Sequence, residues 1–467
     1  MTTRTDGKRS PAERAADGRA ARKAAPLTGH SSWAPAQSRA DPIEMLTADE
    51  VDRVPELLPI RHSRMAVSPL TFLRGSAGVM AADLAAVPHS GLITQLCGDA
   101  HLFNFGVYAS PERRLVFDLN DFDETYTGPF EWDVKRLAAS IALAGRANGF
   151  KRKDRAAAVR FAGRRYREAM ASFAEMRELD LWYASVDVEE LRRQFGEQIG
   201  KSRLARLDKA GAKARTRTSL QAYRKLTGLV DGERRIVADP PLLVPVQDLL
   251  PDIGRKQLES QIHVLLDGFR DSLAEDRKRL FDAFRFVDLA RKVVGVGSVG
   301  TRCWIVLLTG RDDEDPLLLQ VKEAGRSVLA PDDVPSTIPE GRRVVDGQRL
   351  MQAASDIFLG WHTVPGFDGK TRDFYVRQLR DWKGGAVVEE MDPTGMRVYG
   401  GLCAWTLARA HARCGDRIAI ASYLGSSEKF DEALVEFAEL YADQSETDHA
   451  AFVAAIEEGR LSSQPGL

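Results

Sequence analysis

The sequence is poor in cysteine and in long apolar stretches. Its 467 residues include only four cysteines, Cys97, Cys303, Cys403 and Cys414, and none of them forms a CxxC pair. A disulfide framework and a cysteine-rich zinc site are therefore not indicated, and a reducing, cytoplasmic environment is expected. No apolar run approaches the roughly 18 residues that a membrane-spanning helix needs, so no membrane partner is expected.

Neither sign of charge dominates the chain. Lys and Arg number 66, Asp and Glu number 67, and the apolar fraction of 44% is ordinary for a globular protein. This composition excludes a disordered chain, a fibrous repeat and a wholly basic nucleic-acid coat protein. One basic run, residues 201–225, is interpreted as a solvated face or as a patch for an anionic partner. Only Tyr223 could stack there, so a nucleic-acid partner is not favoured.

Hydropathy and turn residues divide the chain into four segments. Residues 1–41 lack an apolar signal-peptide core and are rich in Ala and Arg, which predicts a disordered basic lead, with a transit peptide as the alternative. Residues 42–285 begin with strand–loop–strand patterns and continue as helices. Residues 286–385 are rich in strands, and residues 386–467 are helical. This order predicts an α+β fold in which a small antiparallel-sheet lobe is inserted between helical parts of a larger lobe.

The segment GDAHLFNFG at residues 98–106 carries two polar side chains five positions apart. Asp99 and Asn104 have the Asp-x-x-x-x-Asn spacing of the kinase catalytic loop, where a carboxylate accepts the nucleophile's proton and an amide oxygen holds a metal. A loop lets both side chains converge on one point. The alternative is that both residues cap turns, as Asp and Asn often do.

The segment LVFDLNDFDET at residues 115–125 is an apolar strand that ends in clustered carboxylates. Asp118, Asp121 and Asp123 fall within six residues, and such a cluster is unfavourable unless a cation neutralises it. Mg²⁺ held by one or two carboxylates, phosphate oxygens and water is the favoured explanation. A calcium-binding EF-hand is the competitor, but its glycine and distal Glu are missing at the required offsets.

A glycine-rich loop, GVGSVG at residues 295–300, has the GxGxxG pattern of dinucleotide-binding turns. Such a turn requires a helix directly afterwards, whereas the segment CWIVLLT that follows is typical of a strand. A glycine loop between two strands is the kinase arrangement, in which backbone N–H groups cover the nucleotide phosphates. Lys322 lies on the next predicted strand, where kinases hold the α- and β-phosphates, and an exposed strand lysine is the alternative.

Together these motifs resemble the protein-kinase-like superfamily, in particular its aminoglycoside and choline phosphotransferase branch. CGDAHLFN matches the HGDxHxxN pattern of that branch at Asp99, His101 and Asn104, with Cys97 where the family usually has His. NDFDETYTGPFEWDVKRLA resembles the metal loop and the helix that follows it, which implies that Asp133 is a structural acid.

The chain from about Arg61 to Asp448 also looks like a member of an uncharacterised bacterial family, domain-of-unknown-function family twenty-two fifty-two. The stretches that carry this resemblance are RMAVSPLTFLRGSAGVMAADLA, GDAHLFNFG, NDFDETYTGPFEWDVKRLAAS and GQRLMQAASDIFLGW. Membership brings no known reaction with it.

The order of the motifs departs from that of an ordinary kinase, in which the glycine loop and Lys precede the catalytic and metal loops. In this chain the glycine loop and Lys322 follow the segments that resemble the catalytic and metal loops. A hinge-like segment at 374–385 and the helix LCAWTLARAHARCGD come last. Cutting the chain at one point and joining its original ends would restore the usual order of the motifs. A circularly permuted, two-lobed protein-kinase-like fold is therefore predicted. This hypothesis predicts that the helix at 397–413 packs beside residues 85–105.

The resemblance implies catalytic and metal-binding roles for residues of the early motifs. Asp99 would orient or deprotonate the acceptor hydroxyl. Mg²⁺ would be bound by Asn104 and Asp121, with Asp118 and Asp123 as alternates.

The residues expected to hold the nucleotide lie in the later, strand-rich segment. Lys322 would bind the phosphates, the glycine loop would let its backbone approach them, and the backbone near 378–380 would meet adenine. These residues are Gly295, Gly297, Ser298, Gly300, Lys322, Gln378 and Arg380. The acid that pairs with Lys322 is left open between Glu340 and Asp346 of the following helix, with Glu323 less favoured.

The expected activity is therefore an ATP- and Mg²⁺-dependent phosphotransferase acting on a hydroxyl group of an unidentified small molecule or protein. Two alternatives remain open at this point. One is a non-catalytic nucleotide-binding regulator of the pseudokinase type, and the other is nucleotidyl (AMP) transfer on the same fold.

Overall fold

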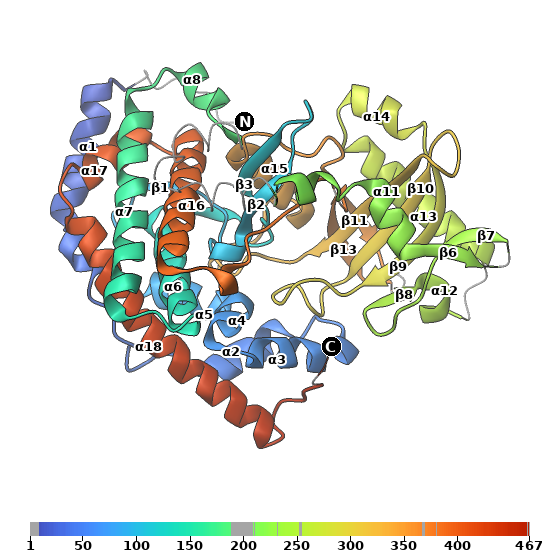
Figure 1. Cartoon of the computed structure of the whole chain (residues 1–467), viewed down its shortest axis with the longest axis horizontal. Coiled ribbons are helices and arrows are strands. Elements are labelled where there is room, and N and C mark those ends of the chain that lie inside the picture. The colour runs from blue at the N-terminus through green and yellow to red at the C-terminus, as the bar shows by residue number, and fades with distance from the viewer. Residues whose placement is uncertain are drawn as a thin grey trace.

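Helices occupy one end of the molecule and a six-stranded sheet the other, with β2 (Phe105–Ala109) and β3 (Leu115–Leu119) between them (Figure 1). The chain therefore has the predicted α+β class. No helix among the described residues combines the length and the apolar composition that crossing a bilayer requires. The computed structural model describes residues 9–187, 209, 211–230, 232–251, 255–366, 369–379, 381–464 and 466.

The six-stranded sheet is antiparallel throughout and has the order β12-β13-β11-β10-β9-β8. Its strands are β8 (Leu243–Pro245), β9 (Arg285–Lys292), β10 (Cys303–Thr309), β11 (Pro316–Ala324), β12 (Gly360–Pro365) and β13 (Thr371–Gln378). The glycine loop joins β9 and β10, which confirms its predicted position between two strands. Lys322 lies in the middle of the sheet, in register with Cys303 on one neighbour and Tyr375 on the other.

Three smaller sheets complete the strands. They are β1 (Ile93–Leu96) with β4 (Tyr126–Pro129), β2 and β3 with β5 (Val186–Asp187), and β6 (Thr227–Val230) with β7 (Glu233–Ile236). Short 3₁₀ helices lie at η1 (Leu27–His30), η2 (Pro55–Leu57), η3 (Leu102–Asn104) and η4 (Val388–Glu390). The β1–β4 pair and the β2–β3 hairpin bring both early motifs to the boundary with the six-stranded sheet.

The helical part is built around α6, whose apolar residues are buried on all sides. Its helices are α1 (Pro11–Ala24), α2 (Pro42–Asp49), α3 (Leu58–Ala66), α4 (Pro69–Gly75), α5 (Ala77–Ala85), α6 (Glu131–Ala147), α7 (Arg152–Glu175), α8 (Glu178–Tyr183), α16 (Pro393–Cys414), α17 (Arg417–Leu424) and α18 (Lys429–Glu457). Val134, Leu137, Ala138 and Ile141 recur at helical spacing in the sequence, and all four are buried on α6.

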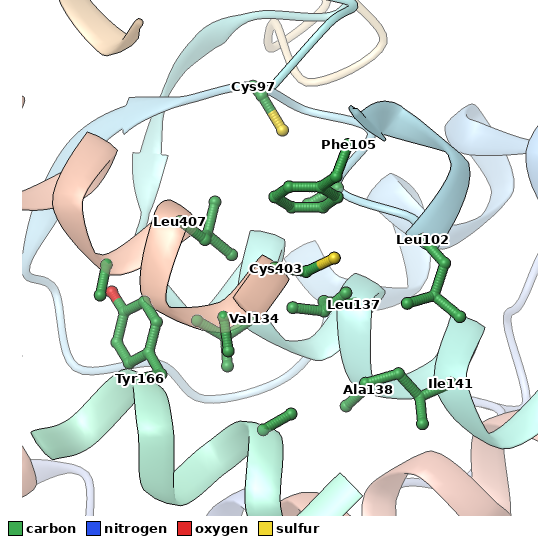
Figure 2. Close-up of a cluster of buried hydrophobic side chains, with 14 of the residues drawn as sticks. Cys97, Leu102, Phe105, Val134, Leu137, Ala138, Ile141, Tyr166, Cys403 and Leu407 are labelled. Atoms are coloured by element: carbon green, nitrogen blue, oxygen red, sulfur yellow. The ribbon is translucent and has the colours of Figure 1, made fainter. Parts of the chain in front are cut away.

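This core supports the GDAHLFNFG loop directly. Figure 2 shows Cys97, Leu102 and Phe105, which flank or belong to the loop, facing side chains of α6 and α16. Each of the three is fully buried. Because protein cores are close-packed and resist deformation, the polar residues between these anchors are held in fixed positions.

Helix α16 lies against the early motifs, as the permutation hypothesis predicts. The Tyr399 hydroxyl donates hydrogen bonds to the backbone carbonyls of Leu102 and Phe105, both at 3.0 Å. The Thr94 hydroxyl donates to the carbonyl of His411 at 3.3 Å. The predicted packing of the helix at 397–413 beside residues 85–105 is therefore confirmed.

The prediction of a disordered lead is wrong from residue 9 onward. Ser10 caps α1, and α1 packs on α17, where Arg14 forms an ion pair with Asp416 at 2.9 Å. A Cβ at Gly18 would lie 2.1 Å from the Ala419 carbonyl oxygen, so only glycine permits this approach. Composition indicated disorder because α1 has few large apolar residues. The order of α1 depends on close backbone packing, which does not need large apolar side chains.

The boundary predicted at residue 286 is also placed too late. The helices α11 (Ser219–Leu226), α12 (Val246–Leu249), α13 (Arg255–Asp271) and α14 (Glu275–Phe281) come before it, and α15 (Glu340–Met351) follows β11. Tyr223 and Leu243 are buried with Ile305 of the sheet, and Phe269 is buried with Val306. This segment therefore belongs with the sheet, because the apolar faces of its helices are covered there. Helical periodicity reveals a buried face but not what covers it.

Candidate functional site

The predicted motifs from both halves of the chain line one cleft. Its volume is about 860 Å³, and it lies between the early loops and the six-stranded sheet. The predicted site residues that line it are Asp99, Asn104, Asp121, Asp123, Gly295, Gly297 and Ser298. Their convergence depends on the approach of the β2–β3 hairpin to β11.

Asp99 is held by two basic side chains at the floor of the cleft. Its carboxylate accepts a hydrogen bond from Arg136 Nε at 2.5 Å and lies 3.3 Å from His101 Nε2. Burial alone raises the pKa of Asp99, but the charges of Arg136 and His101 outweigh burial and hold it well below its usual range. Asp99 is therefore ionised at every physiological pH and can accept a hydrogen bond from a hydroxyl group.

Asn104 links the two acidic motifs through its side-chain amide. Its Nδ2 donates to the backbone carbonyls of Asp99 and Asp121, each at 3.0 Å, and its Oδ1 accepts from the Asp121 backbone N–H at 2.6 Å. These three bonds fix the spacing between the catalytic-loop and metal-loop candidates. The Oδ1 atom has a second lone pair with which it can accept a further partner.

Lys322 reaches across from β11 to the acidic motif. Its ammonium forms a short ion pair with Asp123 and lies 3.5 Å from Asp121 Oδ1. Asp123 also accepts hydrogen bonds from the Tyr375 hydroxyl at 2.5 Å and from the Ser298 hydroxyl at 3.2 Å. Asp123 thus joins the LVFDLNDFDET segment, the glycine loop and the sheet.

The two neighbouring carboxylates have pKa values shifted in opposite directions. Burial raises the pKa of both, but Lys322, through its charge and a hydrogen bond, and Tyr375, through a hydrogen bond, lower the pKa of Asp123 to about 2. For Asp121, burial and the nearby Asp123 charge outweigh Lys322 and raise the pKa. The Asp121 carboxylate is 43% exposed toward the cleft and carries charge that Lys322 does not fully neutralise.

None of the three acids considered as partners for Lys322 contacts it. Glu340 pairs with Arg343, Asp346 lies 3.2 Å from Arg342, and Glu323 pairs with Arg302 and Arg372. The helix α15 that follows β11 does pack on the sheet. Its acids, however, are engaged by arginines one turn away, and the metal loop supplies the counter-charge to Lys322 instead.

The glycine loop is held by arginines from the helical part. Arg53 donates to the carbonyls of Gly297 and Val299 at 2.9 and 2.8 Å, and Arg61 donates to the carbonyl of Gly297 at 2.7 Å. Within the described residues, the backbone N–H groups of Gly297 and Ser298 make no hydrogen bond. Donors of this kind at the edge of a cleft suit an anion.

Three of the candidate residues do not fit their expected roles. Asp118 is buried against Arg409 at 2.6 Å and does not line the cleft, so it is not an alternate metal ligand. Gly300 packs on the Arg53 side chain, outside the cleft. The backbone N–H and side-chain amide of Gln378 both donate to Asp356, so Gln378 is not free to meet a base. Arg380 lies outside the described residues.

Arg377 and Lys383 are among the basic residues of the cleft that the sequence analysis did not identify. Arg377 lies next to Asp121 and Asp123, and its guanidinium donates to the Asn120 carbonyl at 2.7 Å. Burial and the charge of Arg377 lower the pKa of Lys383 to about 7. Arg377 lies two positions after Tyr375 on β13 and so shares its face, a signal that strand alternation provides. Nothing local marks Lys383.

The donor set can accommodate a hard divalent cation, although the described residues hold no preformed cluster of three or more His, Cys, Asp or Glu ligands. Mg²⁺ commonly binds through one or two protein oxygens, with phosphate and water completing the shell. The exposed, imperfectly neutralised Asp121 carboxylate and the Asn104 amide oxygen could supply those two oxygens.

The comparisons with known proteins give a family but no relative of known activity. Residues 53–455 match the profile of a family described as "Uncharacterized protein conserved in bacteria (DUF2252)", and the chain belongs to that family. No curated protein and no solved structure matches the chain.

Proposed function

We propose that this member of the uncharacterised bacterial family is an ATP- and Mg²⁺-dependent phosphotransferase with a circularly permuted, protein-kinase-like arrangement. The observation that carries the proposal is the contact of Lys322 with Asp121 and Asp123, from segments 201 and 199 positions away in the chain. Asp121 and Asp123 line the cleft together with Asp99, whereas Lys322 does not line it and is only 2% exposed. A lysine in contact with carboxylates of the cleft suits a polyphosphate with bound metal once those carboxylates move to the metal.

The order of elements around the sheet supports the kinase-like part of the proposal. The glycine loop joins β9 to β10, Lys322 lies on the next strand β11, and α15 follows it. Protein kinases likewise place a glycine-rich loop over the phosphates and the phosphate-binding lysine on their third strand. The contacts of α16 with the GDAHLFNFG loop support the permutation, since that helix would precede the catalytic loop in an unpermuted chain.

In the proposed reaction, the acceptor's hydroxyl oxygen forms a bond to the γ-phosphorus of ATP. The bond from that phosphorus to the β–γ bridging oxygen breaks, ADP leaves with the electron pair, and the hydroxyl proton passes to Asp99 or to water. Because Arg136 keeps Asp99 ionised, the carboxylate is better suited to orient the hydroxyl than to act as a strong base. A loose transition state needs little more than such positioning.

The residues that would neutralise the charge of the phosphates lie on the opposite side of the cleft from Asp99. Arg377, which lines the cleft, and Lys322, which contacts its carboxylates, would offset the charge of the phosphates. The N–H groups of Gly297 and Ser298 can donate to phosphate oxygens. Mg²⁺, when bound by Asp121 and Asn104, would supply further positive charge to the β- and γ-phosphate oxygens.

The test is to incubate the full chain with Mg-ATP and a bacterial small-molecule extract and to follow the nucleotide by ³¹P NMR. ADP formation that depends on the extract supports phosphoryl transfer. Asp99→Asn should lower the rate by about 10²–10⁴-fold and leave ATP affinity largely unchanged, because Asp99 acts on the acceptor. Asp443→Asn, a matched change at an exposed carboxylate, should have no effect.

The other outcomes identify the alternatives. Release of pyrophosphate with AMP attached to a product would establish nucleotidyl transfer instead. ATP binding with no turnover in any extract would favour the regulator. Full turnover in Asp99→Asn would show that Asp99 has been given the wrong role.

A further inference from the structure

Beside Asp99 the cleft contains an arginine with no carboxylate partner. Arg74, near the end of α4, lines the cleft together with Asp99, His101 and Phe103. Its guanidinium stacks on the Phe103 ring, 4.4 Å from the centroid. Within the described part of the chain it forms no ion pair, and its Nε is buried without a hydrogen-bond partner.

Asp99 cannot serve as the missing counter-charge. Its two carboxylate oxygens are already engaged by Arg136 and His101. The acids whose charges act on Arg74 are Asp99 and the exposed Glu389, yet burial outweighs them and lowers the pKa of Arg74. The ring of His101, itself buried, has an Nδ1 atom that also lacks a partner. The surroundings of Asp99 thus carry an excess of buried positive charge and unused hydrogen-bonding capacity.

Arg74 also lies close to the side of the cleft where the nucleotide would bind. A Cβ on Gly297 would lie 3.0 Å from the Arg74 backbone carbonyl, so the glycine loop passes directly beside α4. Arg74 therefore lies between the loop that would cover the phosphates and the carboxylate that would orient the acceptor. A group bound there would be adjacent to the transferred phosphoryl group.

We infer that the acceptor is a small hydroxylated anion and that Arg74 binds its phosphate or carboxylate group while Asp99 orients its hydroxyl. The inference rests on the proposed function and deepens it by naming the acceptor class. An arginine fixed by stacking presents a planar, preorganised fork that matches two oxygens of a phosphate or a carboxylate. A polycationic acceptor such as an aminoglycoside would instead be repelled by this part of the cleft.

The experiment uses the full chain saturated with Mg²⁺ and a non-hydrolysable ATP analogue, so that the positions of all three nucleotide phosphates are filled. Inorganic phosphate, acetate and spermidine are then titrated in separately and followed by calorimetry. Phosphate or acetate should bind saturably and spermidine should not. Comparing phosphate with acetate distinguishes a phosphorylated acceptor from a carboxylated one.

Arg74→Gln should weaken anion binding by roughly tenfold or more and leave the affinity for the ATP analogue unchanged. Arg74→Lys should restore part of the anion binding, because charge remains but the fork is lost. The matched control is Arg113→Gln, since Arg113 also stacks on an aromatic ring, at 4.2 Å from Trp382, but is paired with Asp381. This variant should behave as the wild type does.

Several results would overturn the inference. These are equal anion affinity in Arg74→Gln and the wild type, spermidine binding in place of anions, and loss of analogue affinity in Arg74→Gln, which would assign Arg74 to the nucleotide. The wild-type titrations still decide whether the cleft binds small anions even if Arg74→Gln does not fold.

Failure of the wild type to bind the analogue would instead count against the proposed function. If the wild type binds anions but not the analogue, and Arg74→Gln loses the anion binding, the result would still support the anion site at Arg74.

Discussion

Two ion pairs made by the LVFDLNDFDET segment differ in what surrounds them. Asp118 and Arg409 form a sealed pair, with each side chain only 1% exposed, and Asp118 also accepts the Ala353 backbone N–H at 2.8 Å. Asp123 and Lys322 form a pair that is open on one side, because Asp123 is 28% exposed to the cleft while Lys322 is only 2% exposed. A sealed pair has no room for a ligand and holds the fold together. In an open pair, a ligand can replace one of the two partners.

The sealed pair gives the largest expected effect. Arg409→Met should lower the free energy of unfolding by about 3–5 kcal/mol, because it leaves Asp118 charged and buried without a partner. Urea denaturation measures the change. The double variant Asp118→Leu with Arg409→Met should recover much of the loss, since no uncompensated charge remains. A loss below about 1 kcal/mol in the single variant would mean that the pair is not sealed.

Lys322→Met should act mainly on ligand binding. We expect the affinity for a non-hydrolysable ATP analogue to fall by roughly 10–100-fold, because a charged contact to the phosphates is lost. The free energy of unfolding should fall by less than in Arg409→Met, since water reaches Asp121 and Asp123. Calorimetry and urea denaturation separate the two effects, and Lys278→Met on α14 is the matched control. Unchanged analogue affinity would remove Lys322 from the site.

The open pair should also show a defined pH dependence. The pKa of Asp123 is lowered from 3.8 to about 2, chiefly by Lys322 acting against the effect of burial. A carboxylate with a lowered pKa stabilises the fold above its unfolded pKa and loses that contribution as pH falls through the folded pKa. The wild type should therefore exceed Lys322→Met in stability by about 2 kcal/mol at pH 5, and the difference should disappear between pH 4 and pH 2. A constant difference across this range would contradict the pairing.

The smallest expected effect is that of Mg²⁺ alone. Millimolar Mg²⁺ should raise the melting temperature slightly, by a stabilisation of about 1 kcal/mol or less, because Asp121 is only partly neutralised by Lys322. Asp121→Asn should abolish the increase, whereas Asp443→Asn, at an exposed carboxylate, should keep it. An increase that survives in Asp121→Asn would place the metal elsewhere.

The local features of the site were predictable because they depend on near neighbours in the chain. The strand–glycine loop–strand order followed from CWIVLLT after GVGSVG, and the buried stripe of α6 followed from its helical spacing. Asp99 and Asn104 lie in one loop, as their spacing suggested. Such features depend on turn chemistry and hydrophobic period, which a short segment specifies by itself.

Other features could not be read from local sequence because they depend on which surfaces meet. Asp118, Asp121 and Asp123 were equivalent carboxylates in the sequence, yet Arg409 neutralises the first and Lys322 the third. Order in α1 depends on the approach of Gly18 to α17.

The sequence by itself determined the identities of the candidate site residues, their local spacing and the α+β class. Only the tertiary structure decided which carboxylates face the cleft, which arginine beside Asp99 forms no ion pair within the described residues, and where the sheet part begins. The physical reason is that charge and burial act through space. A side chain's electrostatic environment is set by partners hundreds of residues away, and these come together only when the chain folds.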